Sequence, residues 1–175
     1  MTSAAIQTLL ADLLVFVVSS TGYSATPVAP EVVPIARPVL EQEVCGKPCP
    51  VFALFDPEFG ILVDDTLDLA GSSAAQSVLL HELVHYLQWR AAGRTAATCE
   101  EWLAREREAY RIQFRWLAAL PPERRGAFPG RPNFSQIRCQ AGPVETSAGS
   151  RIYRERSGGL DQPNPRGAMT ISVQP

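Results

Sequence analysis

Two histidines, His81 and His85, lie four residues apart in the stretch HELVHYLQ, and they are the only histidines among the 175 residues. On an α-helix, residues i and i+4 lie on one face, so the two imidazoles can bind one metal ion together. Glu82 follows about 100° around the helix, close enough to reach a water molecule on that ion. The stretch therefore predicts a helix with a second element packed against its histidine face.

The residues that surround this stretch are apolar, and Glu82 is the only charge between Ser72 and Trp89. A lone carboxylate in a buried helix is costly unless it has a partner. A core helix with hydrogen-bonded histidines is one interpretation. The complete H-E-x-x-H pattern favours the other, a zinc hydrolase in which Glu82 is the general base that takes a proton from water.

A catalytic zinc site uses three protein ligands, and no third histidine exists in the chain. The third ligand must therefore be Asp, Glu or Cys. At about 100° per residue, the apolar side chains after residue 101 form one broad helical stripe, and Glu106 falls near its centre. A carboxylate there needs a binding partner. We predict Glu106 as the third zinc ligand, with Glu108 as the alternative.

The rest of the chain predicts a small α+β domain over residues 1–120. A Ser73–Gln76 capping box begins one helix, which ends before Gly93, and a Thr98–Glu101 capping box begins the next. The short loop between them predicts an antiparallel pair. Before the pair we expect an amphipathic helix over 9–20, an edge strand containing Pro34, and strands over 51–56 and 60–65.

Residues 121–175 differ in composition, because they hold 8 of the 15 prolines and 7 of the 12 glycines. We expect an irregular tail, tied down near Cys139. The formal net charge is only -2, which argues against a nucleic-acid partner. The pair Asp64 and Asp65 ends the last predicted strand, where it either meets solvent or binds a substrate amine.

Four cysteines leave the compartment open. They are Cys45, Cys49, Cys99 and Cys139. Reduced thiols would indicate a cytoplasmic protein, and disulfides an oxidising compartment. Of the possible pairings we favour Cys45–Cys49 with Cys99–Cys139. The apolar run over 9–20 is too short to span a membrane, although a secretion signal is an alternative to the first helix.

HELVHYLQ, followed about twenty residues later by E-R-E-A-Y, resembles the gluzincin branch of zinc metallopeptidases. Their second motif is commonly E-x-x-A with the first Glu as ligand, which is Glu106 here. The layout over residues 1–120 is similar to minimal gluzincins of the ImmA/IrrE type. The resemblance implies a zinc-dependent peptidase that acts on a peptide or protein substrate.

The chain departs from the gluzincin pattern after Ala109. Many gluzincins carry Asp or Asn there to orient a ligand histidine, and this chain has Tyr110. Gln88 and Gln113 fall on the metal-facing sides of their helices, where they can bond a ligand or a substrate, or pair the two helices. Tyr110 and Tyr153 are the candidates for stabilising an oxyanion. A zinc-binding module without turnover, or a zinc hydrolase of a non-peptide substrate, are the alternative functions.

Overall fold

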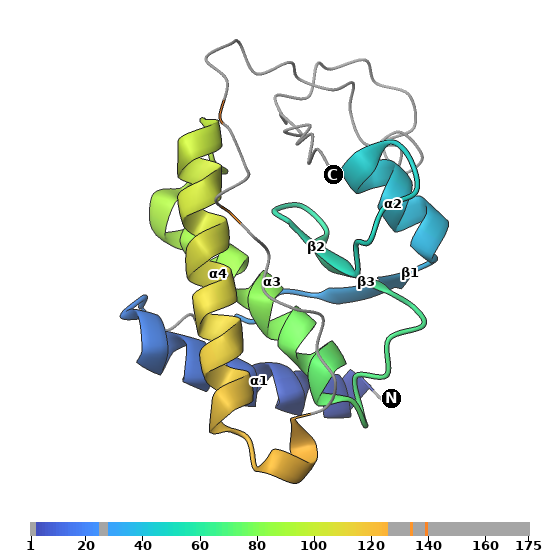
Figure 1. The fold of residues 1–175 in the computed structure, drawn as a ribbon, viewed down its shortest axis with the longest axis vertical. Coiled ribbons are helices and arrows are strands. Elements are labelled where there is room, and N and C mark those ends of the chain that lie inside the picture. The colour runs from blue at the N-terminus through green and yellow to red at the C-terminus, as the bar shows by residue number, and fades with distance from the viewer. Residues whose placement is uncertain (1–2, 25–27, 126–133, 135–138, 140–175) are drawn as a thin grey trace.

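A computed structural model of the chain describes residues 3–24, 28–125, 134 and 139. Within these residues four α-helices, one 3-10 helix and three strands follow one another in the order α1 (Ser3–Thr21), β1 (Val32–Ile35), α2 (Arg37–Cys45), β2 (Ala53–Asp56), β3 (Gly60–Asp64), α3 (Ser73–Ala92), α4 (Cys99–Ala119) and η1 (Pro122–Arg124). The domain is a small α+β fold, as predicted. Helix α3 lies between the sheet and the helices α1 and α4, and α2 packs against β2 and β3 (Figure 1).

The sheet has the strand order β1-β3-β2, in which β1 is parallel to β3 and β2 is antiparallel to it. Pro34 lies on the edge strand β1, as its missing N–H requires. The central strand β3 is buried on both faces. Ile61 and Val63 join the core shared with the helices, and Leu62 alternates to the opposite face. Strand β2 therefore forms the second edge, beside α3.

The first helix is present but longer than the predicted 9–20, because it spans 19 residues. Leu10, Leu13 and Val17 are buried in the core, whereas Val15 on the outer side is 72% exposed. The window Ala4–Thr21 has a mean hydropathy of 1.7, and 17% of it is buried. The helix extends beyond the run over 9–20, and by length and composition α1 could cross a membrane; the prediction of no membrane span stays a prediction.

Both helices of the central pair begin at a capping residue, but only one of the two predicted caps is right. Thr98 caps α4 by accepting a bond from the Glu101 N–H at 3.1 Å. Helix α3 is capped by Ser72 and not by Ser73, because Ser72 has the extended backbone that leaves its hydroxyl facing the first turn. The Gln76 side chain bonds the Leu69 carbonyl.

Two disulfides close the fold, Cys45–Cys49 and Cys99–Cys139, and both pairings match the prediction. The second disulfide joins the start of α4 to the tail. Of the predicted tail the structure describes residues 121–125, which include the short helix η1, together with 134 and 139; Tyr153 lies outside the described residues.

Asp64 does not face solvent at the end of β3, because its side chain is fully buried. It accepts bonds from the N–H and hydroxyl of Thr66 and forms a 2.5 Å ion pair with Arg37. These contacts lower the pKa of Asp64 although burial opposes them. Asp64 therefore ties β3 to the start of α2, and the prediction of a solvated strand end is wrong for this residue.

Candidate metal centre

Helix α3 carries the two histidines within the core. It is apolar on nearly all sides because it is covered by the sheet on one side and by α1 and α4 on the other. His81 and Glu82 are each only 8% exposed. Polar groups at this depth cannot rely on bulk water, so each requires a partner from the protein or a bound ion.

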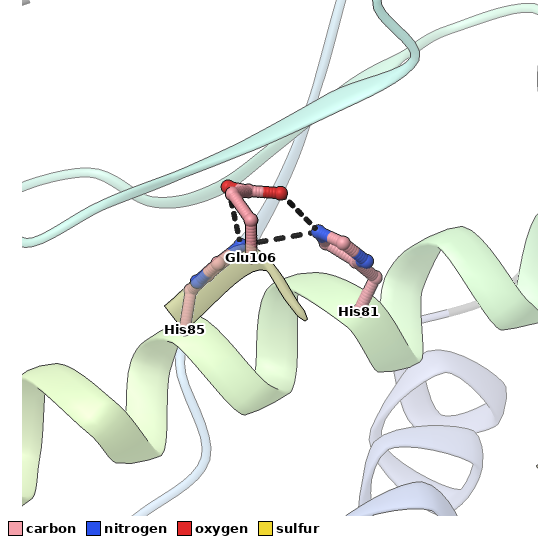
Figure 2. Close-up of side chains that lie close together, drawn as sticks. All are labelled: His81, His85 and Glu106. Carbon is pink, nitrogen blue, oxygen red and sulfur yellow. Dashed lines mark hydrogen bonds and ion pairs between the residues drawn. The ribbon is translucent and has the colours of Figure 1, made fainter. Parts of the chain in front are cut away.

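Helix α4 brings Glu106 against both imidazoles (Figure 2). The Nε2 atoms of His81 and His85 lie 3.4 and 3.1 Å from the Glu106 carboxylate oxygens, and 3.1 Å from each other. All three side chains converge on one point from two helices. The structure therefore brings together the three residues predicted as ligands, and Glu106, not Glu108, is the carboxylate that reaches them.

These spacings fit a tetrahedral metal ion. Ligand atoms about 2.0 Å from a tetrahedrally coordinated zinc ion are separated by about 3.3 Å from one another. The two imidazole Nε2 atoms are 3.1 Å apart, close to that edge length, and they lie 3.4 and 3.1 Å from different oxygens of the Glu106 carboxylate. Two imidazole nitrogens and one carboxylate form a donor set that could hold a metal ion.

His85 and Glu106 are both charged in the metal-free cluster. Burial lowers the pKa of His85, but the hydrogen bond and charge of Glu106 outweigh it and raise the pKa to about 9. Burial raises the pKa of Glu106, and its two imidazole partners more than reverse this, so its pKa is lowered overall. In the metal-free protein a proton between His85 and Glu106 therefore supplies the positive charge that a metal ion would replace.

Glu82 faces the sheet from the same turn of α3. Its Oε2 accepts a hydrogen bond from the backbone N–H of Phe55 at 2.8 Å. This contact fixes the carboxylate beside the outer edge of β2, one residue along the chain from His81. Nothing in the sequence predicted the contact, because it depends on how β2 docks against α3.

Both histidines have a glutamine partner at the other ring nitrogen. His81 Nδ1 lies 3.1 Å from Gln113 Oε1, and His85 Nδ1 lies 2.8 Å from Gln88 Oε1. Of the possibilities that the sequence left open for these glutamines, the structure shows two, because each contacts a histidine predicted as a ligand and each also pairs α3 with α4. Each glutamine oxygen therefore contacts the ring nitrogen that faces away from Glu106.

Glu108 belongs to a different set of contacts. Its Oε2 accepts bonds from the Tyr23 hydroxyl at 2.7 Å and from Gln88 Nε2 at 3.0 Å. Tyr23 follows the end of α1, so Glu108 links α1 to the glutamine behind His85. Glu108 therefore stands behind the ligand cluster and does not belong to it.

Tyr110 covers His81 from the side of α4. The two rings pack edge-on with centroids 4.4 Å apart, and Phe134 packs on Tyr110 with centroids 5.4 Å apart. Burial, followed by the charges of Glu106 and Glu82, raises the pKa of Tyr110 to about 12. Its hydroxyl therefore keeps its proton near neutral pH and can act only as a neutral donor or acceptor. The position of Phe134 was not predicted.

Comparison with known protein families, curated proteins and solved structures finds no match for the chain.

Proposed function

We propose that the protein is a zinc-dependent metallopeptidase of the gluzincin type. The observation that carries this proposal is the convergence of the His81 and His85 Nε2 atoms, 3.1 Å apart, on the Glu106 carboxylate, whose two oxygens lie 3.4 and 3.1 Å from them. His81 and His85 together with Glu106 would hold the ion. Bound there, zinc would lower the pKa of a water molecule to about 7 and polarise the scissile carbonyl.

Glu82 is the general base of the proposed reaction. Its carboxylate takes a proton from the attacking water as the new carbon–oxygen bond forms, and passes that proton to the leaving amine as the carbon–nitrogen bond breaks. The Phe55 N–H holds Oε2 and leaves Oε1 for the water. A group held in this way loses little freedom on reaching the transition state.

The outer edge of β2 is the proposed binding site for the peptide. The N–H of Phe55 turns away from β3 toward Glu82, so by the alternation of an antiparallel ladder the backbone groups of Ala53 face the same way. Within the described residues no strand pairs with this edge. The Phe55 N–H is taken by Glu82, so an extended peptide could add there through the backbone groups of Ala53, which would place its carbonyl beside α3.

The Glu82→Gln substitution tests the proposal. The amide keeps the size of the side chain but cannot take the proton, so hydrolysis should fall by about 10²–10⁴-fold. Zinc content should stay unchanged, because Glu82 is not a ligand. The assay is cleavage of a broad peptide library by the zinc-loaded protein, with Glu58→Gln as a matched substitution on the exposed turn between β2 and β3.

The outcomes separate the alternatives that the sequence left open. Zinc-dependent cleavage that Glu82→Gln abolishes supports the peptidase. Zinc bound at one ion per chain without any cleavage that depends on Glu82 would favour a binding module, or a hydrolase of another substrate. Wild-type protein that binds no zinc would overturn the proposal altogether.

A further inference from the structure

We propose that Gln88 and Gln113 are positioning residues that hold His85 and His81 in the tautomer with the proton on Nδ1. Each Nε2 then presents a lone pair to the metal position. This inference rests on the metal site of the proposed function, and it adds two residues and a reason for their identity. Behind each histidine a series of hydrogen bonds ends on a group that can only donate or only accept, and this sets the direction of every bond in the series.

The series of hydrogen bonds behind His81 ends on the backbone of α3. The Ser77 hydroxyl donates its proton to the Ala74 carbonyl at 2.7 Å. The Ser77 oxygen can therefore only accept from Gln113 Nε2, which lies 3.1 Å away. This turns Gln113 Oε1 toward His81 Nδ1, which must donate. Ser77 is fully buried and Gln113 is 2% exposed, so water cannot substitute in this series.

The series of hydrogen bonds behind His85 ends on α4. Gln88 Nε2 donates to the Arg105 carbonyl at 3.1 Å and to the Glu108 carboxylate at 3.0 Å. Neither of these oxygens carries a proton to give, because Glu108 Oε2 is itself the acceptor for the Tyr23 hydroxyl. Gln88 Oε1 therefore faces His85 Nδ1, which must donate.

The two series of hydrogen bonds differ at the group that accepts from the amide nitrogen of the glutamine. Behind Gln113 that group is the Ser77 hydroxyl, which donates to the Ala74 carbonyl in the wild type but can give up that bond and donate to a carboxylate placed at position 113. Behind Gln88 it is a carbonyl and a carboxylate, which cannot. Replacing the amide by a carboxylate should therefore be tolerated at position 113 and not at position 88. A glutamine that only filled space would show no such difference.

Zinc affinity measured by competition with a chelator tests the proposal. Gln88→Met and Gln113→Met keep the length of the side chain but remove the acceptor, and each should weaken zinc binding by about 10–100-fold. Gln113→Glu should bind zinc as tightly as the wild type or more tightly, and Gln88→Glu should bind zinc as weakly as Gln88→Met. Circular dichroism and thermal melting of the metal-free variants control for folding.

Imidazole ¹⁵N NMR of the zinc-loaded wild-type protein provides a readout that does not depend on affinity, and only two histidines need assignment. Both should carry the proton on Nδ1 and bind zinc through Nε2. A proton on Nε2 of either ring, or Met variants that bind zinc within about twofold of the wild type, would overturn the inference. Zinc binding without peptide hydrolysis would count only against the peptidase, and absence of zinc binding would sink both.

Discussion

Helices α3 and α4 supply the same site from opposite environments. In α3, 13 of 20 residues are buried, whereas in α4 only 5 of 21 are. Polar groups on α3 must be satisfied inside the protein, and each site residue on it has a partner: Gln113 for His81, Phe55 for Glu82, Gln88 for His85. Most polar groups on α4 can turn to water, and those that face α3 contact the site.

The difference explains how two glutamates on α4 come to have different roles. Glu106 and Glu108 are two residues apart and therefore about 160° apart around the axis. Glu106 faces the imidazoles, and Glu108 faces Tyr23 and Gln88. Position relative to α3, and not the type of side chain, decides which carboxylate could bind an ion.

Substituting the two glutamates in turn gives the largest expected effect. Glu106→Ala removes one of three ligands, so zinc should fall from about one ion per chain to near zero after dialysis. Glu108→Ala should retain the ion, because the Arg105 carbonyl still holds the Gln88 amide. Elemental analysis of the purified variants measures this. Equal zinc loss in both variants would mean that facing α3 does not decide the ligand.

Core packing gives the next largest effect. Leu83 on α3 is fully buried, and Leu83→Ala should lower the free energy of unfolding by about 2–5 kcal/mol. Arg107 on α4 is exposed, and Arg107→Ala should change it by less than about 0.5 kcal/mol. Urea denaturation of the metal-free proteins measures both. A small cost at Leu83 would contradict the buried environment of α3.

The sequence predicted those parts of the fold and site that depend on local spacing. Helical periodicity places the i,i+4 histidines on one face and Glu106 on an apolar stripe. Residue type within one element predicts the edge position of Pro34 and the Thr98 cap. The first turn of α3 was misplaced by one residue because two serines are adjacent, and only the backbone angles distinguish Ser72 from Ser73.

Features that depend on how elements dock could not be predicted. The Phe55–Glu82 contact requires the position of β2 over α3, and the bond from Gln113 to His81 requires the rotation of α4. Asp64 was expected at a solvated strand end because a strand pattern does not reveal that α2 will cover it. The likeness to gluzincins stays a prediction.

Loss of the proton from His85 should destabilise the metal-free protein at alkaline pH. The pKa of His85 is raised to about 9 in the metal-free protein, so the folded state holds a proton that the unfolded chain loses above about pH 6.5. The stabilisation is therefore complete below about pH 6.5 and is lost as the pH rises through about 9. Denaturation of chelator-treated protein across this range should show the decline, and His85→Gln should remove it.

Zinc binding should release the proton that His85 holds in the metal-free protein. At about pH 7 binding must displace the proton that His85 shares with Glu106, so zinc affinity should rise with pH up to about 9. Calorimetry in buffers of different ionisation enthalpy should report release of about one proton per zinc ion from the protein side chains. Zinc affinity that does not change with pH would contradict a shared proton in the metal-free site.

The caps give the smallest effect and compare the starts of the two helices. Thr98→Ala removes the acceptor for the Glu101 N–H and should lower the free energy of unfolding by about 1 kcal/mol, while Thr98→Ser should cost only a few tenths. Ser72→Ala should cost less than Thr98→Ala, because its bond to Ala75 N is longer, at 3.3 Å. Helix α3 is also held along its whole length by the core, whereas α4 depends more on its ends. A larger loss for Ser72→Ala in urea denaturation would show that the buried helix, and not the exposed one, depends on its cap.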